Sequence, residues 1–279
     1  MKGKLPIIGL ALGILLLLSI TSSVALHVSQ APAVSKQVST DSLIVKLTGG
    51  GNVPMYQFWS PNDNNTKYKV QFNQVFEAKD SASGGTNGSY DLGTDSKVPG
   101  QTLALSKLSW NFSPLQTKSN GDVNFNLTSS DGTFQFRNHL SANASSLKFD
   151  VVIKNYQFKS QDSMLVLGFK IQVASGSSDN AANTNQDGNS VKFDNGFFQS
   201  TDTATAGNSS VHVGMSTGSD SGSIIYLAYG NFAGTTLVHD PTIGVSDSAQ
   251  SLLGSNYLFI SIIALFVPVA IYRRKMHKN

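Results

Sequence analysis

The residues best spaced for chemistry lie in a polar stretch from residue 183 to residue 194. Side-chain oxygens fall at positions 1, 3, 5 and 12 of a twelve-residue window, and Gly188 stands at position 6. That is the spacing of a calcium loop, in which Gly makes the sharp turn. The residues that would hold the ion are Asn183, Asn185, Asp187, Asn189 and Asp194.

Two departures weaken this calcium site. Position 1 is Asn where Asp is usual, and position 8 is Ser190 where an apolar residue is usual. The residues from Val191 onward also alternate like a strand instead of starting a helix. The sequence therefore leaves two alternatives, a weak calcium site and a polar hairpin loop without an ion.

Two aromatic residues beside a polar loop are the candidate ligand-binding residues. Tyr56 and Trp59 directly precede a loop rich in Asn and Asp, from residue 61 to residue 65. Aromatic side chains commonly line small-molecule sites, where a sugar ring can stack on them. The alternative is that both residues pack in the core or at a sheet edge.

Six N-x-S/T sequons make the chain a candidate glycoprotein. The acceptors are Asn64, Asn87, Asn111, Asn126, Asn143 and Asn208. Four fall in expected loops, while Asn111 and Asn126 fall on the polar faces of expected strands. We therefore expect none of the six to be buried, so that all could carry a glycan in a host with the machinery.

No catalytic residue is predicted. The chain has no Cys, which excludes thiol catalysis and Cys-based metal sites, and none of its five His residues is spaced as a ligand pair. A nucleophile elbow of the form G-x-S-x-G is also missing from the sequence. We expect no cofactor apart from the weak Ca²⁺ already described.

The elements that must position these residues are strands. Leu108, Trp110 and Phe112 alternate with polar residues, and so do Phe134 and Phe136. An alternation of period two with one apolar face indicates half-buried antiparallel strands. The expected strands are 42–48, 54–59, 67–77, 101–112, 122–128, 133–138, 146–157, 163–173, 190–198, 210–215 and 222–229.

This pattern predicts an all-β, antiparallel β-sandwich over residues 41–245. A hairpin is expected over 123–137, turning around 129–132. Two smaller domains, divided near residues 114–121, are the alternative. We expect a flexible start over 26–40 and further loops over 79–99 and 175–190.

The two ends of the chain predict secretion and anchoring. Residues 1–25 have a basic start, an apolar run and a small-residue cleavage motif ending at Ala25, as a signal peptide does. A spacer (246–254) leads to an apolar run that predicts one C-terminal transmembrane helix over 255–272. The basic tail (273–279) is expected to be cytoplasmic, with the ectodomain outside the plasma membrane. An uncleaved first segment and a processed second one remain alternatives.

The net charge of +3 reflects these ends and not the ectodomain. Six of the 20 Lys and Arg residues lie in the signal peptide and the tail. The segment between them therefore has 14 basic and 17 acidic residues, a net charge of about −3. The ectodomain contains no basic cluster with interleaved aromatic residues, which argues against binding to nucleic acid.

In general plan the chain resembles membrane-anchored surface proteins of archaea. The shared features are a signal peptide, a cysteine-free β-domain rich in Ser, Thr and Asn, sequons, one C-terminal span and an Arg/Lys tail. The resemblance assigns no functional residue, because no specific motif supports it.

Three functions follow from the sequence as competing hypotheses. The first is a non-catalytic structural or adhesive protein of the cell surface, whose partners are other envelope proteins or copies of itself. The second is an extracellular module that binds a carbohydrate or another solute. The third is an extracellular hydrolase.

Overall fold

The computed structural model describes residues 32–81, 87–176, 178–218 and 223–246. These residues form strands and one short 3₁₀ helix, η1 (Leu105–Lys107). The strands are β1 (Val34–Ser39), β2 (Ile44–Gly49), β3 (Met55–Trp59), β4 (Thr66–Lys79), β5 (Ser96–Ala104), β6 (Trp110–Phe112), β7 (Gln116–Thr117), β8 (Val123–Ser129), β9 (Phe134–Leu140), β10 (Ser146–Lys154), β11 (Met164–Ser175), β12 (Ser178–Ala181), β13 (Asn185–Asp187), β14 (Ser190–Phe193), β15 (Gly196–Gln199), β16 (Thr203–Ala206), β17 (Ser209–Gly218), β18 (Ile224–Tyr229), β19 (Thr236–His239) and β20 (Thr242–Val245).

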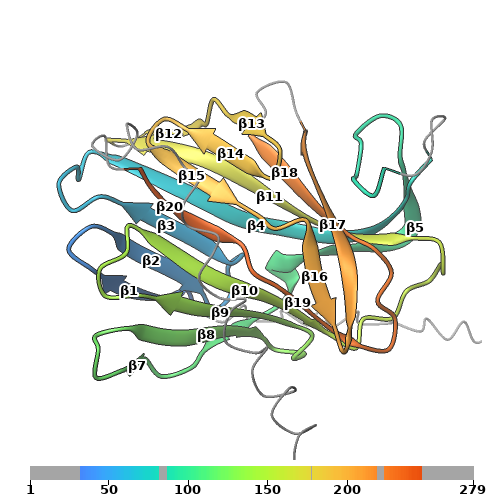
Figure 1. Cartoon of the computed structure of the whole chain (residues 1–279), viewed down its shortest axis with the longest axis horizontal. Helices are drawn as coiled ribbons and strands as arrows, with labels where there is room; N and C mark the ends of the chain where they lie inside the picture. The colour runs from blue at the N-terminus through green and yellow to red at the C-terminus, as the bar shows by residue number, and fades with distance from the viewer. Residues whose placement is uncertain (1–31, 82–86, 177, 219–222, 247–279) are drawn as a thin grey trace, which may run out of the picture. The chain divides into compact units, whose positions relative to one another are not determined.

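All strand pairs are antiparallel, and they fall into two groups. In the first group the order is β1–β2–β3–β4–β11–β18–β17, with β5 also paired to β4 and β12 to β11. The long strands β4 and β11 run side by side through this group (Figure 1).

In the second group β8, β9 and β10 lie side by side, with the short strands β6 and β7 on the outer side of β8. On its other side β10 pairs with both β19 and β20. Strand β19 then pairs with β16. Strand β20 pairs with β15, β15 pairs with β14, and β14 pairs with β13.

The two groups are joined into one continuous sheet of 20 strands. The first half of β17 pairs with β16 of the second group, and its second half pairs with β18 of the first group. An isolated bridge between Gly50 and Trp110 makes a further link, with backbone N–H···O distances of 3.0 and 2.8 Å.

Aromatic rings from the two groups meet in one core. Tyr56 of β3 stacks on Phe149 of β10 with ring centroids 4.9 Å apart, and Phe72 of β4 lies 4.7 Å from Phe136 of β9. This cluster includes buried residues from Val38 to Val245, so it continues across the possible domain boundary near 114–121. Burial of such rings is the main favourable contribution to folding.

A second, smaller cluster lies on β4, β11 and β18, with the segment 87–95 over it. Tyr90 of that segment contacts Phe76 and Tyr226 edge to face, each at a centroid distance of 4.9 Å. The segment stays close because Gly214 of β17 has no side chain; a Cβ there would lie only 2.6 Å from the Cα of Ser89.

The structure confirms the all-β, antiparallel class and the hairpin of β8 and β9. It corrects the strand expected over 101–112. The chain breaks at η1, where Leu105 enters the core, and crosses from the first strand group to the second. The expectation of a flexible start over 26–40 is wrong for residues 34–39, because these residues form strand β1 and pair with β2.

The predicted signal peptide, the transmembrane helix over 255–272 and the tail lie outside the described residues, as does the spacer after Ser246. Among the residues that are described, none belongs to a helix long and apolar enough to cross a membrane.

Candidate functional site

The outer face of β8, β9 and β10 carries several polar side chains that contact one another. Phe125, Leu127 and Phe136 point into the core, so alternation along the strands directs their neighbours outward. The register sets Asn124 opposite His139, and His139 opposite Lys148. We call this the polar face; its members are Asn124, Asn126, Gln135, Arg137, His139, Lys148 and Asp150.

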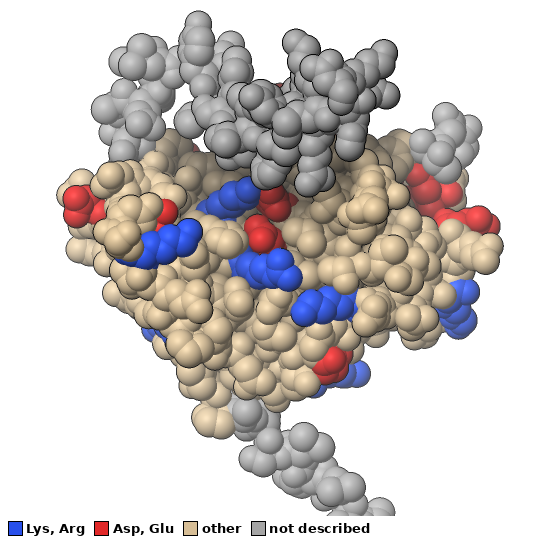
Figure 2. All heavy atoms as spheres, turned by 60° about the horizontal axis from the view of Figure 1, so that its bottom comes forward, with Lys and Arg blue, Asp and Glu red and all other residues tan. Residues whose placement is uncertain are grey.

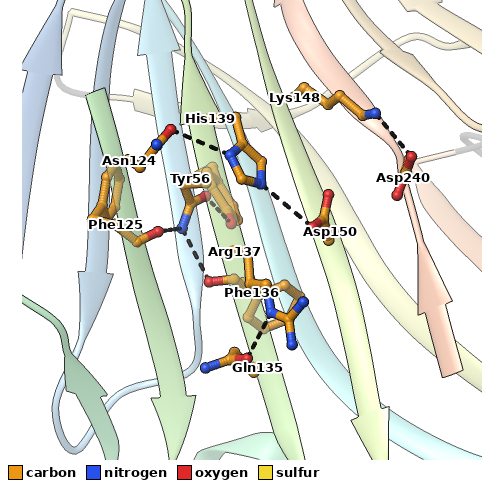
Figure 3. Close-up of polar contacts among 11 residues, drawn as sticks. Tyr56, Asn124, Phe125, Gln135, Phe136, Arg137, His139, Lys148, Asp150 and Asp240 are labelled. Atoms are coloured by element: carbon orange, nitrogen blue, oxygen red, sulfur yellow. Dashed lines mark hydrogen bonds and ion pairs between the residues drawn. The ribbon is translucent and has the colours of Figure 1, made fainter. Parts of the chain in front are cut away.

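The side chains of the polar face form short pairs (Figure 3). The His139 Nδ1 lies 3.2 Å from Asn124 Oδ1, and its Nε2 lies 3.3 Å from Asp150 Oδ2. Lys148 Nζ donates to Asp240 Oδ2 at 2.8 Å. A neutral imidazole can donate to only one of its two acceptors, whereas a protonated one can donate to both.

Arg137 is the least committed cation of the polar face. Its Nε donates to Gln135 Oε1 at 2.9 Å. Within the described part of the chain its Nη groups make no further hydrogen bond. The face therefore offers amides, an imidazole and a guanidinium to a polar partner, but it has no exposed aromatic ring and no nucleophile.

Charge is sparse around this array. Figure 2 shows a few Lys and Arg residues lying close to Asp and Glu, with wide areas of other residues around them. The ion pairs Lys148–Asp240 and His139–Asp150 are partly exposed, and such pairs contribute roughly 1 kcal/mol or less to stability. They are better suited to fixing the orientation of side chains than to holding the fold together.

Tyr56 lies beneath the polar face and not on it. The ring is fully buried, and its hydroxyl donates to Asn138 Oδ1 at 2.6 Å. The Asn138 amide in turn donates to the carbonyls of Phe125 and Phe136. Burial raises the pKa of the Tyr56 hydroxyl. The predicted ligand contact is therefore not available to this side chain.

Trp59 is also largely buried, with 7% of its surface exposed. Its indole N–H donates to Asn64 Oδ1 at 3.0 Å, and Lys67 Nζ lies 4.8 Å from the ring centroid. The exposed ring face that a stacked sugar needs is therefore missing. Trp59 instead anchors the β3–β4 loop, over residues 60–65, to the sheet.

That loop forms one wall of a small polar hollow with a volume of about 210 Å³. The side chains of Asn62, Asp63, Thr66, Tyr68 and Asn195 line it, together with Ser60 and the end of β20. Neither Tyr56 nor Trp59 lines this hollow; the aromatic residue that does is Tyr68 on the next strand.

The structure does not bring the five predicted calcium ligands together. Asn185 and Asp187 belong to β13 and Asn189 to the turn before β14, whereas Asp194 lies in the turn after β14. A strand rises about 3.3 Å per residue, so the four residues of β14 alone keep the two turns more than about 10 Å apart. Ligands of one Ca²⁺ must all lie within about 2.6 Å of it.

A buried Ser–His pair resembles part of a hydrolase site but is oriented differently. Ser200 Oγ lies 3.1 Å from His239 Nε2, and Tyr229 OH lies 3.1 Å from His239 Nδ1. The Ser200 hydroxyl donates to the Thr201 carbonyl at 2.9 Å, and that carbonyl also lies 3.3 Å from His239 Nε2. The imidazole nitrogen facing Ser200 is therefore best placed to donate a proton, which is the opposite of a general base.

The only glutamate in the chain is a structural anion that sequence reasoning did not single out. Glu77 is fully buried on β4 and accepts hydrogen bonds from the backbone N–H groups of Lys159 and Ser160 and from the hydroxyls of Ser163 and Tyr156. These donors belong to the β10–β11 loop, so the carboxylate fastens that loop. Burial and the Glu77 charge raise the pKa of Tyr156.

Five of the six sequon residues are exposed. They are Asn64, Asn87, Asn111, Asn143 and Asn208. Asn126 is half-buried on β8, and its backbone N–H donates to the hydroxyl of Ser113 at 2.9 Å. Because Ser113 is the third residue of the sequon at Asn111, these two sequons are tied together on adjacent strands.

Within the part of the chain that the structure describes, no three His, Asp or Glu side chains gather as a metal site would require.

Comparison with known proteins gives no family for this chain. No model of a protein family matches it, and no curated protein sequence matches it. Among solved structures, heparinase III matches over 80% of this chain with 13% identity and a TM-score of 0.40. The heterodimeric complex of ER glucosidase II matches over 80% with 7% identity and a TM-score of 0.17. The chain spans 36% and 33% of the lengths of these two proteins.

Proposed function

We propose that this chain is a non-catalytic structural or adhesive protein of the cell surface. In this proposal residues 1–25 direct secretion, a helix over 255–272 anchors the chain, and residues 273–279 remain in the cytoplasm. The β-domain stands outside the membrane and contacts other envelope proteins or further copies of itself. Glycans on the exposed sequons would add to its polar surface.

The observation that carries the proposal is the polar face of β8, β9 and β10. It is broad, poor in net charge and built on adjacent strands, and its donors and acceptors are held by neighbouring side chains. A non-obligate interface is about as polar as the rest of a protein surface and carries direct hydrogen bonds, which this face can supply.

We further propose that the domain is a β-sandwich, with the two strand groups as its layers. The contacts of Tyr56 with Phe149 and of Phe72 with Phe136 support this arrangement, because each joins a ring of one group to a ring of the other. Sheets that pack face to face form their core from such inward rings.

Two observations weigh on the competing functions. The orientation of Ser200 toward the Thr201 carbonyl argues against a hydrolase that uses this pair. The polar hollow beside the β3–β4 loop favours a binding module as the second candidate. Its 210 Å³ is below the roughly 300–1,000 Å³ typical of ligand sites, so its ligand would be small.

Amine-reactive cross-linking on intact cells tests the structural reading, with the linked peptides identified by mass spectrometry. We expect reproducible links from Lys148 of the polar face to another envelope protein or to a second copy. Arg137→Ala should weaken these links, because it removes the least committed donor of the face. Lys192→Ala, a matched loss of an exposed cation on β14, should leave them unchanged. A chain found without neighbours, or equal effects of the two variants, would contradict the proposal.

A further inference from the structure

The polar hollow lies where three separate segments of the chain meet. The β3–β4 loop supplies Asn62 and Asp63, the β14–β15 turn supplies Asn195, and Ser246 follows β20. Backbone bonds hold these segments in place: Asn195 N–H donates to the Tyr68 hydroxyl at 3.3 Å, and Ser246 N–H donates to the Asn195 carbonyl at 2.7 Å. The hollow is therefore built by tertiary structure and not by one loop alone.

The β3–β4 loop is held rigid around its carboxylate. Asp63 Oδ1 accepts the backbone N–H groups of Asn65 and Thr66 at 3.0 and 3.3 Å. Hydrogen bonds from the Thr66 side chain and from these N–H groups lower the pKa of the Asp63 carboxyl, which is therefore ionised at neutral pH. With Trp59 fixed to Asn64, the loop is organised before any ligand arrives.

Two amides at the hollow remain uncommitted. The side chains of Asn62 and Asn195 make no hydrogen bond to any described residue, although each backbone N–H is bonded. Each amide offers two N–H donors and one acceptor oxygen. Together with the Asp63 carboxylate and the Tyr68 hydroxyl, they supply both donors and acceptors to the lining of a small volume.

This combination suits a ligand that carries several hydroxyl groups. Each hydroxyl both donates and accepts, which matches amides and a carboxylate but not a purely anionic or apolar ligand. The volume of 210 Å³ is below the roughly 300–1,000 Å³ typical of ligand sites, so the hollow suits a small ligand such as one sugar ring. We propose that the polar hollow binds a single glycosyl unit.

The position of the hollow suggests where that glycosyl unit comes from, and this step rests on the proposed membrane anchor. Ser246 lines the hollow, and the predicted span begins nine residues later, at 255. Nine extended residues reach at most about 30 Å. The hollow would thus open near the lipid headgroups, so the sugar could belong to a glycolipid of the same membrane or be free in solution.

The test uses the full chain, produced without N-glycosylation and kept in a detergent that has no sugar headgroup. Ligand-observed NMR with methyl α-mannopyranoside, methyl α-glucopyranoside and methyl β-galactopyranoside should show saturable binding of at least one. Asn62→Ala and Asn195→Ala should each weaken binding about two- to tenfold, the effect of losing one hydrogen bond. The control Asn208→Ala removes an exposed Asn in the turn between β16 and β17, which does not line the hollow, and should have no effect.

A second arm distinguishes the two sources. The full chain is reconstituted in phosphatidylcholine vesicles with and without a glycosylceramide that carries the same sugar as a glycoside bound in the first arm, and the binding of that free glycoside is measured in each. Weaker binding of the free sugar in the glycosylceramide vesicles identifies the lipid-borne glycosyl group as a competitor. Equal binding in both identifies a soluble sugar.

Three results would overturn the inference: no response to any of the three glycosides, equal weakening by Asn208→Ala, or binding of Ca²⁺ alone that Asp63→Asn and Asn195→Ala abolish. None of these would affect the proposal of a surface protein, which depends on where the chain is found and on what it cross-links to.

Discussion

At the scale of single residues, His239 makes the stability of the domain depend on pH. The imidazole is buried between Ser200 and Tyr229, and this burial lowers its pKa to about 4 from an ordinary value of 6.5. The unfolded chain therefore takes up a proton at a higher pH than the folded one. The stability contributed by neutral His239 is complete above about pH 6.5 and is lost as the pH falls toward 4.

We expect this contribution to be on the order of 3 kcal/mol across that window. His239→Gln keeps a hydrogen-bonding group but cannot take up a proton in this range. The variant should be less stable than the wild type at pH 7, and the difference should shrink as the pH falls to 4. Urea unfolding at several pH values measures this difference, and a constant difference would contradict the assignment.

The residue types alone predicted the polar residues of the surface better than they predicted the buried polar residues. The alternation of Phe134 and Phe136 with polar residues correctly separated the buried side of that strand from its polar side. The Ser200–His239 pair is 39 positions apart in sequence, and no local pattern joins the two residues. One feature of the sequence could have identified Glu77. A single glutamate next to Val75 and Phe76 in a strand would be costly to bury unless hydrogen-bond donors surround it.

At the scale of elements, the contact between β17 and the segment 87–95 depends on one missing side chain. Gly214→Ala would drive a Cβ against the Gly88 carbonyl and the backbone of Ser89. The segment must then move, taking Tyr90 from Phe76 and Tyr226. We expect a loss of about 1–3 kcal/mol and faster chymotrypsin cleavage after Tyr90.

Gly230→Ala is the matched control for this prediction. A Cβ at Gly230 meets its nearest neighbour, Val211, at 3.6 Å, an ordinary contact distance. This variant should have the same stability and the same rate of chymotrypsin cleavage as the wild type. If Gly214→Ala behaved in the same way as Gly230→Ala, the segment would not depend on the close approach.

Long strands with one buried face were predicted from sequence. The short strands β16, β19 and β20, which also bury one face, were missed, as were the exposed β12 and β13. Residues 163–173 and 133–138 alternate clearly and became β11 and β9. Strand β12 has four exposed residues, and β13 is exposed at both ends, so neither shows an apolar period. Their stretch, within 175–190, therefore looked like a loop, although its backbone continues the sheet.

At the scale of the whole molecule, the absence of Cys makes the proposed orientation directly measurable. Lys118→Cys places one thiol in the exposed β7–β8 turn, and Lys278→Cys places one in the basic tail. A maleimide that cannot cross membranes should label the first on intact cells and the second only after permeabilisation. The unmodified chain should not be labelled at all. Labelling of both thiols from outside would contradict the topology.

The central place of β20 has a mechanical consequence. This strand is hydrogen-bonded to β10 on one side and to β15 on the other, and Ser246 follows it directly. A force applied to the chain beyond Ser246 along the strand direction loads the hydrogen bonds of both ladders at the same time. The bonds of one ladder cannot break one after another. In the proposed anchored arrangement the tether would load the middle of a sheet, and β20, the last strand among the described residues, would carry the tension.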